Sequence, residues 1–246
     1  MNKTKLLYHG YRFPSEIISY AVWLYHRYCL SFRDVEDLLA ERGIVVSYET
    51  IRSWCNKFGP AYARTIKKRR GSLGDTWYMD EVNIVMVRGE RRYLWRAVDQ
   101  ESLPHERSDC CGYGDVLDIL VQKRKNKQAA LRFFRKLMKG QGRSARLIVT
   151  DKLSSYGAAR KVIMSSSMHC HERYANNRAE VSHEHTRAQE RQMRRFKSPG
   201  QAQRFLAVHS QVHNLFRIGR HLLRAANYRL LRSRSFETWQ QVTCAC

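Results

Sequence analysis

The segment at residues 76–87 constrains the fold most, because it combines a strand-forming composition with charge. β-Branched and aromatic residues dominate it and no helical stripe of apolar residues appears, which predicts a β-strand. Asp80 and Glu81 nevertheless place two carboxylates in the middle of this apolar run. A buried carboxylate is costly unless it pairs with a cation or binds a metal. Asp80 therefore lies at an exposed edge, pairs with an arginine, or belongs to a functional site.

The net charge narrows the classes of partner. The 246 residues include 45 Lys and Arg against 22 Asp and Glu, a net charge of +23. Such an excess favours a polyanion, most often nucleic acid, and a membrane surface is the other candidate. No apolar run approaches the roughly 20 residues of a membrane span, and the N-terminus lacks a signal-peptide core. Seven irregularly spaced cysteines fit a reducing compartment, so we expect a soluble intracellular protein.

Residues 1–70 are predicted to form an all-α domain that contains a helix-turn-helix. Ser31 is a candidate cap for one helix, and Ser47 caps a second helix that is predicted to end at Gly59–Pro60. The second helix would present polar side chains to base edges or phosphates: Tyr48, Arg52, Ser53 and Asn56. A helical hairpin used only for packing is the alternative, but the charge of the chain favours DNA. Residues 67–70 are interpreted as a basic linker.

Residues 71–246 are predicted to form an α/β domain with a mixed sheet, because strand-like runs alternate with one helical pattern. The further strands are expected at 92–98, 116–121 and 147–150, and the helix at 127–138. Asp151 directly follows the last strand, where α/β sheets usually place their chemistry, although a helix N-cap would also explain it. The polar stretch at 101–113 fits neither pattern and is predicted to be a looped insertion.

A basic helical part is expected to complete this domain. A long polar helix is predicted to begin at Asn176 or Asn177 and to carry Glu180 at one end of a stripe of arginines. The candidate phosphate-binding side chains there are Arg187, Arg191, Arg194 and Arg195. Ion pairs within the helix are the alternative interpretation of the stripe. The motifs at 169–171 and 183–185 contain histidines, but alternating positions on a helix do not converge on a metal.

Three acids stand in order along the predicted α/β domain: Asp80, Asp151 and Glu180. Carboxylate oxygens are the ligands that Mg²⁺ prefers. Converging carboxylates that hold two such ions suit the in-line displacement at a phosphodiester. These acids are therefore the candidate metal-binding and catalytic residues.

The sequence resembles the DDE transposases of the IS6 (IS26-like) insertion-sequence family over most of its length. The motifs that carry the resemblance are GDTWYMDEV, RRYLWRAVDQ, VLDILVQKRKNKQAALRFFRKLMKG, VTDKLSSYGAA, NNRAE and ERQMRRFKSPGQAQRFL. The family's three acids fall on Asp80, Asp151 and Glu180, and its basic residue beyond the glutamate falls on Arg187.

This resemblance implies an RNase H-like catalytic domain of the retroviral integrase type. It also implies strand cleavage and strand transfer on double-stranded DNA, at the terminal inverted repeats of an element and in target DNA. The expected cofactor is a pair of Mg²⁺ ions, for which Mn²⁺ can substitute. We further expect a homodimer or larger assembly on DNA, in the cytoplasm of a bacterium and associated with its nucleoid, with no membrane partner.

One departure of this chain from the family pattern leaves alternatives to an active transposase open. Residues 101–113 intervene where the family passes almost directly from one strand to the next. The insertion is either a harmless extension or a lesion that leaves a catalytically inactive, DNA-binding relative of a transposase. A nuclease of similar fold is the third reading, and its products would be cut rather than joined.

Overall fold

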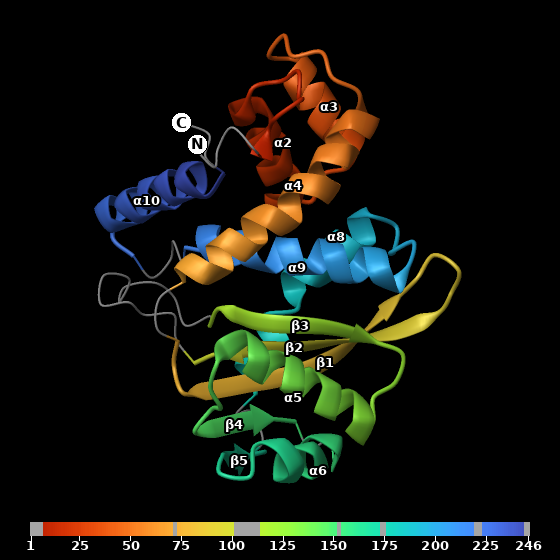
Figure 1. The fold of residues 1–246 in the computed structure, drawn as a ribbon, viewed down its shortest axis with the longest axis vertical. Coiled ribbons are helices and arrows are strands. Elements are labelled where there is room, and N and C mark those ends of the chain that lie inside the picture. Colours follow the sequence, from red (N-terminus) through yellow and green to blue (C-terminus); the bar gives the residue numbers. More distant parts are fainter. Residues whose placement is uncertain are drawn as a thin grey trace. The chain divides into compact units, whose positions relative to one another are not determined.

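The chain divides into two compact units (Figure 1). A computed structural model describes residues 7–70, 73–100, 114–151, 154–172, 176–218 and 223–243, so the predicted insertion at 101–113 lies outside the described residues. One unit comprises Met1–Arg70 with Val208–Cys246, and the other comprises Gly71–Ala207. The sequence assigned residues 208–246 to the catalytic domain, whereas here they group with the N-terminal helices. No helix in the described ranges is long and apolar enough to span a bilayer.

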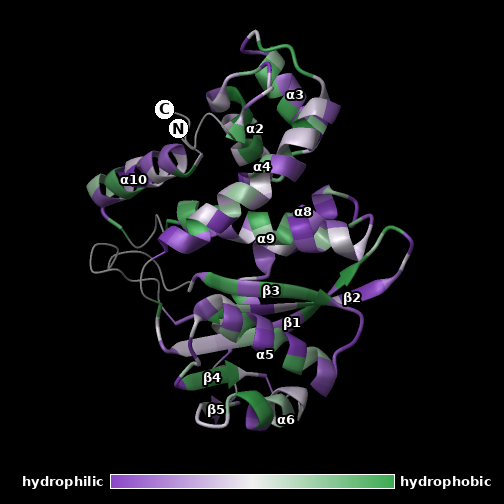
Figure 2. Ribbon diagram, viewed as in Figure 1, coloured by the Kyte–Doolittle hydropathy of each residue, from purple (hydrophilic) through white to green (hydrophobic). Residues whose placement is uncertain are grey.

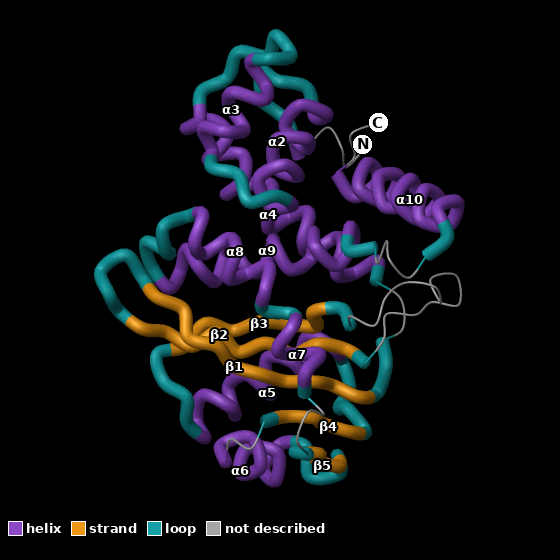
Figure 3. The backbone as a smooth tube through the Cα atoms, turned by 180° about the vertical axis from the view of Figure 1, so that it is seen from behind, coloured by secondary structure: helices purple, strands orange, loops and turns teal. Residues whose placement is uncertain are grey.

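A five-stranded mixed sheet forms the centre of the unit Gly71–Ala207 (Figure 3). Its strands are β1 (Thr76–Val85), β2 (Arg91–Asp99), β3 (Val116–Gln122), β4 (Leu147–Thr150) and β5 (Met168–Cys170), in the order β3-β2-β1-β4-β5. The first three strands are antiparallel neighbours, and β4 and β5 continue the sheet in parallel from β1. This is the RNase H-like architecture that the resemblance predicted.

Helices α5 (Lys127–Gln141) and α6 (Ser154–Ile163) cover one face of this sheet. Asn126 caps α5 by accepting a hydrogen bond from the Ala129 N–H, and Gly142, at φ 71°, ends the helix in the left-handed region that glycine tolerates. Apolar side chains at alternate positions of β1 and β2 pack against both helices to form the core, which includes Trp77, Met79, Trp95, Ala97, Phe133, Phe134 and Tyr156. Figure 2 shows green stretches on β3, β4 and α6, which contribute Leu117, Ile148 and Ala159 to this core.

The opposite face of the sheet carries α7 (Asn177–Val181), which packs on β1 and β2 (Figure 3). The chain continues into α8 (Glu184–Gln192) and α9 (Pro199–Phe216). The buried Asn176 side chain attaches the start of α7 to β1 by donating a 2.9 Å hydrogen bond to the Met79 carbonyl. This contact places α7 beside the residue that precedes Asp80.

The other unit is helical, with α2 (Ser15–Arg27), α3 (Phe32–Ala40), α4 (Tyr48–Arg69) and α10 (Ala225–Thr243). Ser31 caps α3 as predicted, and it forms a capping box with Asp34 through reciprocal hydrogen bonds of 3.1 and 2.7 Å.

One boundary prediction in this unit is wrong, because α4 continues through Gly59–Pro60 to Arg69. A proline inside a helix removes one backbone hydrogen bond. Here the buried stripe of Tyr62, Ala63 and Ile66 extends the apolar face of α4 beyond the proline, and its packing offsets that loss. Lys67, Lys68 and Arg69 therefore form the last helical turn, where cations interact favourably with the helix dipole, and do not belong to a linker.

Candidate active site

The pairing of β1 with β4 brings Asp80 and Asp151 together. The two strands are parallel and Met79 lies opposite Thr150, so the acids that follow these residues are neighbours at the same level of the sheet. One carboxylate oxygen from each of Asp80, Glu81 and Asp151 lies within 4.8 Å of the other two. Within the described ranges this is the one group of three or more acids, histidines or cysteines close enough to share a metal ion. We call these three residues the carboxylate cluster.

His183 lies beside Asp80, on the face of the sheet that carries α7. Its Nε2 atom is 3.3 Å from Oδ2 of Asp80, and the ring is almost fully buried. Burial and the nearby charge of Arg96 lower the pKa of His183 to about 4, although Asp80 acts in the opposite direction. The imidazole is therefore neutral near pH 7, and it leaves the negative charge of Asp80 available to a cation.

Glu81 lies on the opposite face of β1 from Asp80, as strand alternation predicts, but that face is covered by helices. Glu81 is only 8% exposed, so it does not face the solvent. Its Oε1 accepts a hydrogen bond from Lys125 Nζ and its Oε2 accepts one from the Tyr156 hydroxyl, both at 2.7 Å. Burial raises the pKa of Glu81, and these two donors offset part of the rise. Sequence reasoning missed Glu81 as a member of the cluster.

Glu180 is exposed on α7 and is not part of the carboxylate cluster. Asn176 holds the helix that carries Glu180 to β1, by its hydrogen bond to Met79, the residue before Asp80. Of the three predicted acids, the structure therefore brings Asp80 and Asp151 together and places the third on a short neighbouring helix. Its role as a metal ligand remains a prediction.

The predicted long polar helix is broken, because α7 ends at Val181 and α8 begins at Glu184. Arg96 of β2, 2% exposed and opposite Asp80 in the strand register, donates hydrogen bonds to the Ser182 carbonyl and the Thr186 hydroxyl. A guanidinium group offers five donors, so it satisfies acceptors that a helix break leaves without backbone partners. Arg96 therefore stabilises the break between α7 and α8.

The predicted arginine stripe is not continuous for the same reason. Arg187 donates a 2.9 Å hydrogen bond to the Asn83 carbonyl of β1, so its half-exposed side chain helps to fasten α8 to the sheet. Arg191 is exposed in the last turn of α8. Arg194 and Arg195 are also exposed, but they follow the end of α8 at φ 51° and 77° and so leave the helical face. These side chains remain candidates for phosphate contacts without forming one ridge.

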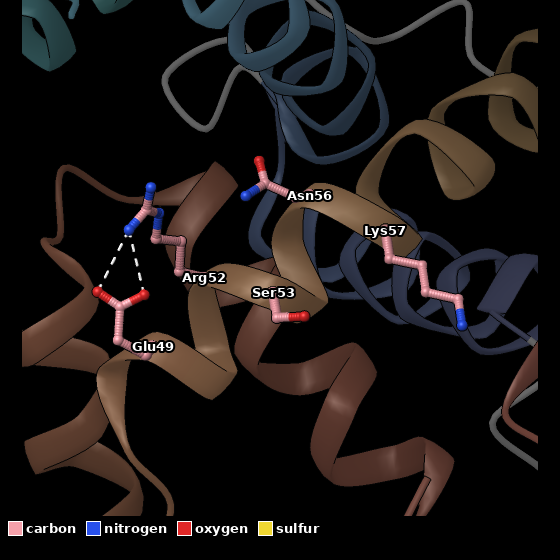
Figure 4. A pocket seen from close by; sticks show the side chains of 5 residues that line it. All are labelled: Glu49, Arg52, Ser53, Asn56 and Lys57. Carbon is pink, nitrogen blue, oxygen red and sulfur yellow. Dashed lines mark hydrogen bonds and ion pairs between the residues drawn. The ribbon is translucent and has the colours of Figure 1, made fainter. Parts of the chain in front are cut away.

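The exposed face of α4 gathers most of the side chains predicted to contact DNA (Figure 4). A shallow hollow there is lined by Glu49, Arg52, Ser53, Asn56 and Lys57. Arg52 donates to both carboxylate oxygens of Glu49, at 3.1 and 3.2 Å. Tyr48 is half-buried under the guanidinium group of Arg33, which lies 5.1 Å from the ring centre. Sequence reasoning missed Lys57, which follows Asn56 on the same exposed surface.

An RNase H-like sheet with carboxylates gathered on its central strands defines the class of the polynucleotidyl transferases. A family model described as a DDE domain, of the IS240 transposase type, matches residues 74–218. The transposase for insertion sequence-like element IS431mec of Staphylococcus aureus is 32% identical over 178 residues, which cover 71% of this chain and 74% of that relative. The transposase for insertion sequence element IS257 in transposon Tn4003, also from Staphylococcus aureus, is 31% identical over the same shares. The chain therefore belongs to the IS6 family of DDE transposases.

Solved structures also resemble this chain, at low sequence identity. The catalytic domain of Mos1 transposase with raltegravir and Mg is 16% identical, with a TM-score of 0.41 over 76% of this chain and 94% of that one. The HTLV-2 integrase catalytic core domain in complex with magnesium is 13% identical, with a TM-score of 0.39 over 60% of this chain and 88% of that one.

Proposed function

We propose that this transposase cleaves DNA strands at the terminal inverted repeats of its insertion sequence and joins them to target DNA, with Asp80, Asp151 and Glu180 as the metal-binding acids. The observation that carries the proposal is the convergence of one oxygen each from Asp80, Glu81 and Asp151 within 4.8 Å. Asp80 and Asp151 would hold the cation from neighbouring parallel strands. Glu180 would complete the site from α7, whose attachment through Asn176 keeps it near β1.

The residues present fit a hard divalent cation. The cluster offers carboxylate oxygens alone, which is the donor set of Mg²⁺, with Mn²⁺ as a substitute. The neutral ring of His183 leaves the charge of Asp80 in place. When bound, a pair of such ions supplies activation of the attacking water or 3′-hydroxyl and stabilisation of the leaving oxygen. Asp80, Asp151 and Glu180 would hold these ions, the first two from neighbouring strands and the third from α7.

The proposed macromolecular partner is double-stranded DNA, both at the element ends and in the target. The net charge of +23 supports this, as do the exposed α4 side chains Arg52, Ser53 and Asn56. Exposed Arg191, Arg194 and Arg195 would contact backbone phosphates. Coordinated chemistry on two ends requires at least a homodimer on DNA, which light scattering of the complex would detect. Such a substrate places the protein at the bacterial nucleoid.

A strand-transfer assay on DNA that carries the terminal inverted repeats tests the proposal. Removing one ligand charge, as in Asp80→Asn, Asp151→Asn or Glu180→Gln, is expected to lower cleavage and joining by about a hundredfold or more while DNA binding is kept. Glu184→Gln is the matched control, because Glu184 is an exposed acid at the start of α8. If the unmodified protein binds the ends but neither nicks nor joins them, it is an inactive DNA-binding relative. Products that are cut but never joined would indicate a nuclease.

A further inference from the structure

Lys125 lies close to the carboxylate cluster and has no role in the proposed chemistry. It lies in the turn between β3 and α5, and its Nζ atom is 2.7 Å from Oε1 of Glu81. Glu81 in turn shares the cluster with Asp80 and Asp151. The Lys125 side chain is 39% exposed, whereas that of Glu81 is 1% exposed. The ammonium group therefore stands at the solvent-facing border of the cluster, one contact away from the acids.

Stability does not explain this arrangement. A buried carboxylate costs desolvation energy, and an ion pair with a partly exposed lysine returns little of it. Placing Glu81 beside two further carboxylates adds repulsion. The Tyr156 hydroxyl fixes the second oxygen of Glu81, so the carboxylate points in one direction only. The burial of Glu81 therefore costs stability, and its effect is to hold the Lys125 ammonium group in one position.

The turn around Lys125 has the character of a phosphate-binding surface. Lys123 and Arg124 precede Lys125 in sequence, and both are exposed. Lys123, Arg124 and Arg132 line a hollow together with Gln122, Asn126 and Gln128. An ammonium group has three N–H donors and Glu81 takes one of them, so Lys125 can donate to an anion at the same time. A DNA strand that approaches Asp80 and Asp151 carries such anions in its phosphates.

We propose that the Lys125 ammonium group contacts a phosphate of the DNA strand that is cleaved at Asp80 and Asp151, and that Glu81 is the positioning residue that holds Lys125 there. The inference rests on the proposed function and adds to it a substrate contact outside the metal-binding acids. Lys125 compensates the charge of the bound strand, and Glu81 acts through Lys125.

The test compares Lys125→Gln with Lys127→Gln, a matched control that removes one charge two residues away. Single-turnover cleavage of end DNA with Mg²⁺ gives the maximal rate and the half-saturating DNA concentration, and metal-free binding gives an affinity without chemistry. Lys125→Gln loses a charge-assisted hydrogen bond to phosphate. It should lower the ratio of the maximal rate to the half-saturating DNA concentration by about tenfold or more. Lys127→Gln should stay within about twofold, because its charge is screened by solvent. Lys125→Arg should recover most of the loss, because arginine keeps the positive charge and donates to phosphate.

The role of Glu81 is tested by a double-mutant cycle with Glu81→Gln and Lys125→Gln. If Glu81 acts through Lys125, the double variant is no worse than Lys125→Gln alone. Additive losses would overturn the positioning role, and equal behaviour of Lys125→Gln and Lys127→Gln would overturn the phosphate contact. Thermal unfolding of each variant excludes misfolding as the cause. If the unmodified protein binds ends without cutting them, the proposed function fails by itself, and equal affinities of the two lysine variants would then reject Lys125 separately.

Discussion

Replacing Arg96 with methionine probes how the chain holds α7 and α8 in place. Arg96 is 2% exposed on β2, and its guanidinium group donates to the Ser182 carbonyl and the Thr186 hydroxyl at the break between the two helices. Methionine has a similar length and fills the same space, but it offers no donor. Arg96→Met therefore removes the hydrogen bonds while it keeps most of the packing.

The expected cost follows from the two acceptors that lose their donor. A buried polar group without a partner costs about 1–3 kcal/mol, so the Ser182 carbonyl and the Thr186 hydroxyl together cost about 2–6 kcal/mol. The variant no longer has to desolvate a buried cation, which offsets part of this cost. We expect a net local destabilisation of about 2–4 kcal/mol, which corresponds to an opening equilibrium raised about 30- to 1000-fold.

Native-state hydrogen exchange over residues 176–192 measures that opening. Arg96→Met should exchange faster there by the factor given above, while β1 keeps its protection. Arg92→Met is the control on the same strand, because Arg92 pairs with the exposed Glu90 at 2.6 Å and such surface pairs contribute less than about 1 kcal/mol. Equal protection of residues 176–192 in both variants would refute the idea that Arg96 maintains the break.

Three further predictions concern packing, pH and DNA recognition. Phe134→Ala removes a fully buried ring from the core of α5 and should lower the free energy of unfolding by about 3–5 kcal/mol in urea titrations. Burial, together with His209, lowers the pKa of His26 from 6.5 to about 3, so the unfolded chain binds a proton first as pH falls. Stability should therefore decrease below about pH 6.5, by about 2 kcal/mol at pH 5, and His26→Asn should flatten this dependence in urea titrations at both pH values. Arg52→Ala should weaken binding to end DNA by about 1–3 kcal/mol in titrations, with a smaller loss on unrelated DNA.

The sequence predicted the sheet wherever a strand carries a long apolar run. The segments now seen as β1, β2, β3 and β4 were all expected, because apolar, β-branched or aromatic residues predominate in each. The three residues of β5, Met168–Cys170, are too few to show a period, and they pair only because β4 offers its free edge. Local patterns therefore identify strands that form by their own composition, and they miss strands that form by pairing.

The part of the candidate site that lies on these strands was also predictable from local sequence patterns, whereas the part that depends on long-range contacts was not. Asp80 and Asp151 end up adjacent because each sits at a defined place on neighbouring parallel strands, which the chain order already indicates. The break between α7 and α8 depends on Arg96, which lies 86 residues before Ser182. The burial of Glu81 depends on Tyr156, which lies 75 residues further along the chain. Contacts at such separations leave no signal in a helical or strand period.

The arrangement of cations around β1 favours one explanation of Asp80 over the others that the sequence left open. An arginine does lie opposite Asp80 in the strand register, but Arg96 directs its guanidinium group to the α7–α8 break. The group beside Asp80 is His183, which burial keeps neutral. Lys125 is held by Glu81 on the other face of the strand. Arg96 and Lys125 thus each donate to another acceptor, which is compatible with a metal ion at Asp80.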